Sequence, residues 1–536
     1  MKVDRTKSLP KSRQVIRVAI LCLALATLSV SVLTPRAAAF IEDTRDDSVR
    51  DKLLRECRKQ IRKGNYESAL KLYRELIDKN AADVQARLGA SLVYLKMADY
   101  LHCLEEAAEV LKLNKANARA HALAGTSLLR SGFVNAASFQ LQQAMDLDPK
   151  DALGFGGAAE VDYYEGRLKE SRAKSLYAHN LDPDEPDFIL TYARSSSRVE
   201  DFKEAADAYE LFLSVAPVTD TERRDRIRGL ITFYRQLAGL HVHQITGANT
   251  AELPFQLGSD RRPYINLKVN GRDAKFVIDT GSGFTVLSRD AAKRLGVSEL
   301  ARGGNSQGLG GDGKFQIVYG LVKQLQLGEM KIRMVPCFVR AFHGASDRPI
   351  DERADGFIGL SILSHFLTQL DYKEHTMRLE RNDDKPALAQ AELLPGATVV
   401  PFRTTQNGLI SIETQFDENT TINAILDSGA SSSVISAAAV ERLKMHDRII
   451  KGQTASVVGA GGITENVQML FIRNCKVADL QQGNLRALVM DFNAINETSG
   501  FEQSGILGGD FLRHFRVTID FSRAQLSFQP HTIPAK

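Results

Sequence analysis

The first half of the chain carries a helical pattern of apolar and polar positions that repeats every 34 residues. Large side chains recur in one phase, at Tyr66, Tyr100, Val134, Leu168 and Phe202. Three positions later the side chains are all small, at Ala69, Cys103, Ala137, Ser171 and Ala205. A small residue lets two helices approach closely, and a large apolar residue fills the groove between them. The pattern therefore predicts five stacked helix pairs.

Helix ends follow the same period, because proline stands fifteen positions after the large residue at Pro149, Pro183 and Pro217. A closing amphipathic helix is predicted over 222–240. The array, residues 47–240, resembles the tetratricopeptide repeat (TPR) family, although the chain has no Trp. The resemblance implies an α-solenoid whose concave surface binds a protein or peptide partner. A rigid spacer is the alternative.

After Leu240 the pattern changes from helical to alternating. Residues 241–262 are predicted to be a linker, with a short strand between His241 and Gly247. Farther on, short apolar runs are separated by glycine-containing turns, and Asn270-Gly271 between two such runs predicts a hairpin. The second half is therefore expected to be β-rich.

Two segments of this β-rich half share four landmarks in the same order. Each begins with an apolar strand that ends in Asp-Thr/Ser-Gly, at Asp279 and at Asp427. A glycine-rich stretch follows, then an apolar-apolar-Gly triplet, and finally Leu-x-His-Phe with apolar-Asp-aromatic close behind. A single Asp-Thr/Ser-Gly triplet is weak evidence, whereas four matched landmarks indicate an internal duplication.

This duplicated region resembles the retropepsin-like aspartic proteases, with both halves in one chain as in pepsin-like enzymes. The resemblance implies a duplicated all-β domain, with lobe 1 at 263–385, an interlobe linker at 386–408 and lobe 2 at 409–530. It assigns Asp279 and Asp427 as the catalytic carboxylates. It implies that the active-site loops are supported by Thr280, Gly281, Ser282, Ser428, Gly429 and Ala430. The flaps that cover the substrate would be Gly308, Leu309, Gly310 and Gly311 in lobe 1, and Gly459, Ala460, Gly461 and Gly462 in lobe 2.

The expected chemistry needs two carboxylates side by side. Two carboxyl groups at short range cannot both ionise, because their negative charges repel, so the pair shares one proton. The ionised member takes a proton from a water molecule, and the protonated member donates a hydrogen bond to the scissile carbonyl. This reaction requires neither a metal nor a cofactor. The expected substrate is a peptide or protein, and the expected class is an aspartic-type endopeptidase.

Other matched residues receive structural interpretations. His365 and His514 are equivalent across the duplication and are expected to have a structural or surface role. Asp371 and Asp520 each end a strand and are expected in a salt bridge or a turn. Two rival functions remain open: a non-catalytic TPR scaffold or peptide-binding protein with a degenerate protease-like domain, and a self-processing enzyme with little activity in trans.

Within residues 1–39, six basic residues lie among the first seventeen positions, an apolar run extends from Val18 to Leu33, and small residues occupy Ala37 to Ala39. This order predicts an export signal, with a signal anchor as the alternative, and therefore a periplasmic or secreted protein. A membrane is expected as a partner only if the segment is an uncleaved anchor. The net charge of +4 over 536 residues gives no reason to expect nucleic acid as a partner. Cys57 and Cys103 fall on helical faces and are expected to be small buried side chains.

Overall fold

The computed structural model describes residues 44–218, 221–311, 314–342, 353–381, 396–417 and 421–531. Within these ranges the chain forms two compact units. The first is made of the described parts of Met1–Asp162, Lys169–Tyr192 and Leu211–Thr221, and the second of the described parts of Tyr163–Leu168, Ala193–Glu210 and Glu222–Lys536. The predicted export segment, residues 1–39, lies outside the described residues. Within the described ranges, no helix is long and apolar enough to span a bilayer.

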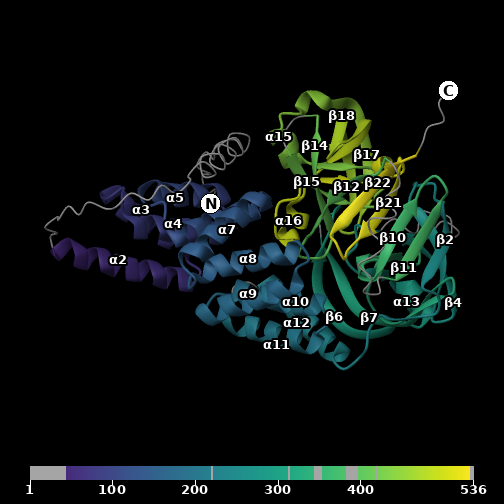
Figure 1. Ribbon diagram of the computed structural model, residues 1–536, viewed down its shortest axis with the longest axis horizontal. Coiled ribbons are helices and arrows are strands. Elements are labelled where there is room, and N and C mark those ends of the chain that lie inside the picture. Colours follow the sequence, from purple (N-terminus) through teal and green to yellow (C-terminus); the bar gives the residue numbers. More distant parts are fainter. Residues whose placement is uncertain are drawn as a thin grey trace. The chain divides into compact units, whose positions relative to one another are not determined.

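Residues 44–237 form helices joined by short turns (purple to blue in Figure 1). In chain order these are α2 Thr44–Arg62, α3 Tyr66–Lys79, α4 Val84–Lys96, α5 Tyr100–Leu113, α6 Ala118–Arg130, α7 Val134–Leu147, α8 Ala152–Tyr164, α9 Leu168–Leu181, α10 Pro186–Arg198, α11 Phe202–Val215 and α12 Thr221–Leu237. The predicted repeat is confirmed, because the five large phased residues are the first residues of α3, α5, α7, α9 and α11. The closing helix is confirmed as α12.

The small phased residues are buried between helices. Ala69, Cys103, Ala137, Ser171 and Ala205 all have 0% of their surface exposed. Cys57 is equally buried, so the structural interpretation of both helical cysteines is confirmed, and Cys337 and Cys475 of the β-rich half are also buried free thiols. The turn that precedes each phased helix contains a left-handed residue, at Gly64, Ala98, Gly132, Gly166 and Glu200. Glycine adopts this conformation without steric cost, whereas other residues do not.

Lobe 1 and lobe 2 are built from the same succession of elements. Lobe 1 contains β3 Pro263–Val269, β4 Arg272–Ile278, β5 Thr285–Ser288, α13 Arg289–Leu295, β6 Ser298–Gln307, β7 Lys314–Leu327, β8 Met330–Arg340, β9 Gly356–Ile358, α14 Leu360–Leu363, β10 Phe366–Asp371 and β11 Thr376–Arg381. Lobe 2 contains β14 Ile410–Phe416, β15 Thr421–Leu426, β16 Val434–Ser436, α15 Ala437–Arg442, β17 Ile449–Gly459, β18 Gly462–Val477, β19 Leu480–Met490, β20 Gly505–Leu507, α17 Gly509–Leu512, β21 Phe515–Asp520 and β22 Gln525–Pro530. Lobe 2 adds η3 His446–Arg448 and α16 Asn493–Ser499.

The sheets join the two lobes through their last hairpins. Strand β10 of lobe 1 pairs antiparallel with β21 of lobe 2, with Leu370 opposite Val517. In Figure 1 the yellow hairpin β21–β22 accordingly lies beside the teal hairpin β10–β11. One hydrophobic core runs through both lobes, and its fully buried aromatic residues include Phe276, Phe366 and Phe416. The lobes are therefore parts of one folded domain.

The two predicted linkers are wrong for about half of their described length, which forms strands. Residues 241–262 contain β1 Gln244–Thr246, which confirms the predicted short strand, and also β2 Thr250–Leu257, which pairs with β11 and β3. Alternate residues of β2 are buried, a period-2 pattern hidden by its polar neighbours. The described part of 386–408 forms β12 Thr398–Pro401 and β13 Arg403–Thr404, which pair with β22 and β14; its residues 386–395 lie outside the described residues.

The end of the helical array belongs to the same compact unit as the lobes. The ring of Phe233 in α12 stacks on that of Tyr319 in β7, with centroids 4.6 Å apart. The guanidinium of Arg198 at the end of α10 donates a hydrogen bond to the hydroxyl of Thr404, at 2.6 Å. The last repeat and the closing helix therefore pack directly on the β-rich domain.

Candidate active site

Each predicted catalytic aspartate follows a buried strand that runs parallel to the apolar-apolar-Gly strand of its lobe. Strand β4 pairs with β9, and the backbone N–H of Asp279 donates to the carbonyl of Ile358 at 2.9 Å. Strand β15 pairs with β20 in the same way, and the N–H of Asp427 donates to Leu507 at 3.0 Å. The strand ends are fixed by these bonds, so each carboxylate starts from a rigid support.

The two active-site loops are cross-linked through Thr280 and Ser428. The Thr280 hydroxyl donates to the carbonyl of Leu426 at 2.8 Å and accepts from the N–H of Ser428 at 2.9 Å. The Ser428 hydroxyl donates to the carbonyl of Ile278 at 2.8 Å and accepts from the N–H of Thr280 at 3.0 Å. Both side chains are 1% exposed. Four buried hydrogen bonds with two-fold symmetry thus hold one loop against the other.

The glycines of the two triplets let each carboxylate reach across to the other lobe. A Cβ atom at Gly281 would clash with the carboxylate of Asp427, and one at Gly429 would clash with that of Asp279. Glycine is therefore required sterically at both positions. The two aspartate side chains also hydrogen-bond to each other. The structure thus brings the two sequence-predicted carboxylates together.

The two carboxyl groups do not titrate alike. Burial raises the pKa of Asp279 well above its ordinary value, and the neighbouring charge of Asp427 raises it further. Burial also raises the pKa of Asp427, but there the hydrogen bond from Asp279 and the backbone N–H groups of Gly429 and Ala430 oppose the rise. The pKa values of both carboxyl groups are therefore raised, and the two groups titrate as a pair that shares one proton.

The backbone donates unequally to the two carboxyl groups. Asp427 Oδ1 accepts from two backbone N–H groups, those of Gly429 at 2.8 Å and Ala430 at 3.0 Å. Asp279 Oδ1 accepts from Gly281 at 2.9 Å. Ala430 and its lobe 1 equivalent, Ser282, also donate to the backbone carbonyl of the aspartate of their own loop, at 3.3 and 3.4 Å. Because donors stabilise the ionised form of a carboxyl group, the additional donor favours the negative charge on Asp427.

The two predicted flaps meet at their tips. The N–H of Gly461 donates to the carbonyl of Leu309 at 2.8 Å, and the N–H of Gly311 donates to the hydroxyl of Thr464 at 3.1 Å. Gly308 lies against Ala460, and Gly310 lies so close to the carbonyl of Gly462 that a Cβ atom there would clash with it. The predicted flap residues of the two lobes are thus in mutual contact.

One nearby cation was not predicted from the sequence. Arg340, the last residue of β8, lies with its guanidinium 5.0 Å from the ring centroids of Phe315 and Phe342. Burial lowers the pKa of Arg340 to about 10, and the charge of Asp279 opposes this change. No motif marks a single arginine at a strand end, so only the folded structure identifies it as a neighbour of the dyad.

The structural interpretation of Asp371 and Asp520 is confirmed. Asp371 binds Arg516 at 2.6 Å and accepts from the N–H groups of two following turn residues. Asp520 forms an equivalent turn and pairs with Arg523. Neither residue is part of the dyad.

The two equivalent histidines have different surroundings. His514 of lobe 2 is exposed. His365 of lobe 1 contacts Glu200 and His243, two residues that no sequence motif marks. Burial and the neighbouring His243 lower the pKa of His365 to about 4, so its ring is neutral at pH 7. Glu200 offered one signal in the sequence, because it occupies the repeat position where three of the other four residues are glycine.

Comparison with known proteins agrees with this architecture. The aspartyl protease family model matches residues 265–362 and, a second time, residues 412–511. DNA damage-inducible protein 1 of Saccharomyces cerevisiae is 30% identical over 119 residues, which are 22% of this chain and 25% of that protein. The protein of the same name from Cryptococcus neoformans var. neoformans is 27% identical over 143 residues, 26% of this chain and 30% of that one. The chain thus spans only a quarter to three tenths of the length of these relatives.

Solved structures resemble each half separately. A TPR protein of Thermus thermophilus is 20% identical and covers 34% of this chain and 98% of its own, with a TM-score of 0.30. The aspartic proteinase of Irpex lacteus is 13% identical and covers 53% of this chain and 98% of its own, with a TM-score of 0.34. The fold and the site define a TPR-like helical array followed by a two-lobed domain of the aspartyl-protease type.

Proposed function

We propose that the chain is an aspartic endopeptidase in which Asp279 and Asp427 activate one water molecule. The observation that carries the proposal is the pair of buried, mutually hydrogen-bonded carboxyl groups, one from each lobe, on loops that are locked together by Thr280 and Ser428. A carboxyl pair whose pKa values are pushed apart is what general acid–base catalysis requires.

The asymmetry of the dyad assigns the roles. Ionised Asp427 accepts a proton from the water as its oxygen attacks the scissile carbonyl carbon. Protonated Asp279 donates its proton to the carbonyl oxygen, and a tetrahedral diol forms. The C–N bond then breaks while the amine nitrogen takes a proton from Asp427, and the diol returns a proton to Asp279 as the new carboxyl group forms. Both carboxyl groups end in their starting states, so no covalent intermediate is needed.

The remaining parts of the chain have supporting roles in this proposal. The paired flap tips separate to admit an extended peptide and close over it, which excludes water from the dyad. The helical array docks the substrate or a partner protein, because repeat arrays of this kind present extended concave surfaces. The basic and apolar order of residues 1–39 supports activity outside the cytoplasm.

Hydrolysis of a mixed peptide library by the full chain tests this proposal, over a pH range from acidic to mildly alkaline. The parent is expected to cleave, and Asp279→Asn and Asp427→Asn are each expected to reduce the rate by about 10³-fold or more, because either change removes one of the two proton carriers. Asp520→Asn is the matched control, since it removes a carboxylate of lobe 2 that serves only a turn.

Two results would contradict the proposal. Cleavage by both Asn variants at the parental rate would place the chemistry elsewhere. The non-catalytic scaffold would be favoured if the folded parent cleaved no peptide and the Asn variants bound partners as the parent does. Removal of N-terminal residues from the parent alone would instead point to a self-processing enzyme.

A further inference from the structure

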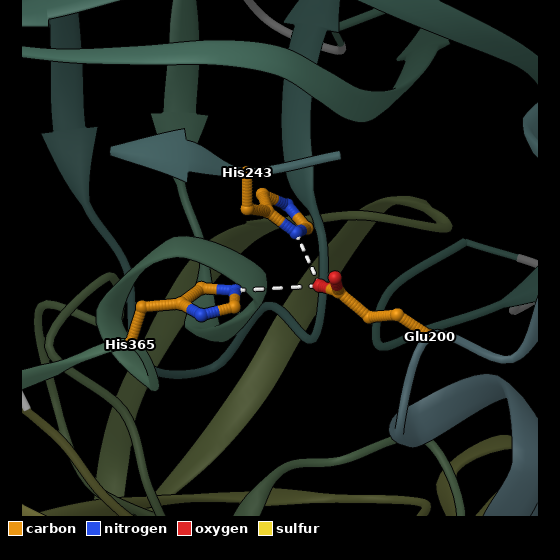
Figure 2. A group of neighbouring side chains, drawn as sticks. All are labelled: Glu200, His243 and His365. Carbon is orange, nitrogen blue, oxygen red and sulfur yellow. Dashed lines mark hydrogen bonds and ion pairs between the residues drawn. The ribbon is translucent and has the colours of Figure 1, made fainter. Parts of the chain in front are cut away.

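Three side chains from distant parts of the sequence meet at the point where the last helical repeat packs on lobe 1. Glu200 is in the turn between α10 and α11, His243 follows α12, and His365 lies between α14 and β10. Figure 2 shows the carboxylate of Glu200 reaching toward both imidazole rings. His243 Nδ1 lies 2.6 Å and His365 Nε2 lies 3.6 Å from the same oxygen, Glu200 Oε1. All three residues belong to one compact unit.

The set has the donor chemistry of a transition-metal site. Two imidazole nitrogens and one carboxylate oxygen lie within 4.8 Å of one another. Zinc binds such ligands at about 2.0–2.2 Å, which places ligand atoms of a tetrahedral site about 3.3 Å apart. The distances from Glu200 Oε1 to the two imidazole nitrogens, 2.6 and 3.6 Å, lie on either side of that spacing, so small side-chain rotations would bring all three atoms to one ion. The fourth position would be filled by water.

The two imidazole rings lie against each other as well as beside the carboxylate, with their centroids 4.5 Å apart. An imidazole nitrogen with a free lone pair is a common metal ligand, so each ring can supply one ligand atom to an ion that lies beside the Glu200 carboxylate. Within the described residues, this is the one group of three or more His, Cys, Asp or Glu side chains whose ligand atoms are spaced closely enough to hold a metal ion.

Glu200 and His243 each carry an energetic cost, from backbone conformation in the first and from burial of a polar atom in the second. Glu200 has φ of 63°, in the left-handed region where the equivalent turns at Gly64, Gly132 and Gly166 use glycine. A glutamate there costs about 1 kcal/mol relative to a residue without a Cβ atom. The side chain of His243 is only 8% exposed, and its Nε2 atom is buried without a hydrogen-bond partner in the described part of the chain. Turn geometry alone would favour glycine over Glu200.

From these observations we propose that Glu200, His243 and His365 form a binding site for one divalent transition-metal ion of the zinc class, which joins the last repeat to lobe 1. The proposal does not depend on peptidase activity. It has a consequence for the dyad, because backbone N–H groups of Leu360 and Ser361 donate to the carbonyls of Ser282 and Gly283 at 2.8 and 2.9 Å. The metal would therefore brace the turn that supports the Asp279 loop.

Zinc titration of the full chain, after dialysis against a chelator and then metal-free buffer, tests the site. One Zn²⁺ per chain is expected to bind with a dissociation constant below about 10 µM and to raise the Tm by roughly 5 °C at saturation. Replacement with Co²⁺ should give the visible absorption of a four-coordinate nitrogen–oxygen site. Absence of stoichiometric binding would overturn the proposal.

Matched variants distinguish this site from adventitious binding. His365→Ala should weaken binding at least about tenfold, while His514→Ala, the equivalent and exposed histidine of lobe 2, should leave it unchanged. Glu200→Gly should also weaken binding, and it should fold because three of the other four turns of the array use glycine at this position. Equal binding by the parent, His365→Ala and Glu200→Gly would show that zinc binds elsewhere, and equal loss in His514→Ala would also contradict the site.

Discussion

Lobe 1 and lobe 2 form the same active-site loop but surround it with different partners. In lobe 2 two backbone N–H groups serve the carboxylate of Asp427, whereas in lobe 1 the carboxyl of Asp279 has a hydrogen bond from Gly281. In lobe 1 the landmark histidine of the duplication meets Glu200 and His243, whereas His514 of lobe 2 is exposed. Duplication thus supplies a symmetric frame, and small local differences give the two carboxyl groups unequal hydrogen bonding.

The largest loss of stability is expected at the cross-link formed by Thr280 and Ser428, where the two lobes are most alike. Thr280→Val and Ser428→Ala each leave a buried N–H and a buried carbonyl without a partner, so each should lower the free energy of unfolding by about 2–4 kcal/mol. Urea denaturation measures this loss. Thr285→Val is the matched control, because the buried Thr285 hydroxyl has no hydrogen-bond partner within the described residues, and its removal should be nearly neutral. Unequal losses for the two loop variants would show that the cross-link is not symmetric.

A smaller effect, on kcat/KM, is expected from substitutions at the flap tips. Gly310→Ala should lower kcat/KM about tenfold, because Gly310 has φ of 88° and the new Cβ atom would clash with the carbonyl of Gly462. Gly271→Ala is the control, since Gly271 has φ of 81° but open space around it, so it shares the backbone strain without the clash. Steady-state kinetics on a cleaved peptide measures both. Equal rates for the two variants would mean that contact between the flaps does not matter for turnover.

Two aspartates of lobe 1 should shift stability with pH in opposite directions. The pKa of Asp279 is raised, so its stabilising effect is complete below its unfolded pKa and is lost as the pH rises through the folded pKa. Asp279→Asn should therefore lose less stability than the parent on going from acidic to alkaline pH.

For Asp371, burial raises the pKa, but the N–H of Glu374 and the guanidinium of Arg516 outweigh it and lower the pKa. The stability that Asp371 contributes is present above its unfolded pKa and is lost as the pH falls through the folded pKa. Asp371→Asn should therefore remove stability at neutral pH and little in acid. Thermal unfolding across pH checks both variants, and slopes of the same sign would contradict the assigned shifts.

The smallest effect on stability and kcat/KM is expected at Ser282, the residue after the Asp-Thr-Gly triplet of lobe 1. The Ser282 hydroxyl donates to the carbonyl of Phe284 at 2.9 Å, a contact that Ala430 of lobe 2 lacks. Ser282→Ala should cost about 1 kcal/mol of stability and change kcat/KM only a few-fold. A loss of activity as large as that expected for Asp279→Asn would assign Ser282 a direct role in the reaction.

The sequence predicts the parts of the molecule that repeat. The 34-residue phase identifies the helix starts from Tyr66 to Phe202, and the doubled landmarks bring Asp279 and Asp427 to one site. Periodic patterns can be recognised in a single sequence because each repeated unit buries equivalent positions and so has similar residue types there.

Features that arise only in tertiary contact were not predictable. Strand β2 resembles a linker in the sequence because it has only three alternating buried apolar residues, namely Ala251, Leu253 and Phe255. The Glu200–His243–His365 cluster combines residues that are far apart in the chain, and His365 has an equivalent in lobe 2 that suggests a shared structural role. The unequal hydrogen bonding of the two aspartates is a feature of the folded loops that their matching sequences do not reveal.

In the proposed mechanism, two carboxyl groups, one from each lobe, share one proton. The most direct test is the pH dependence of kcat/KM for the full chain on a peptide that it cleaves. A bell-shaped profile is expected, whose acidic limb reports ionisation of the dyad to its singly charged form and whose alkaline limb reports loss of the shared proton. A profile with one limb only, or activity that persists fully after both carboxyl groups have ionised, would contradict it.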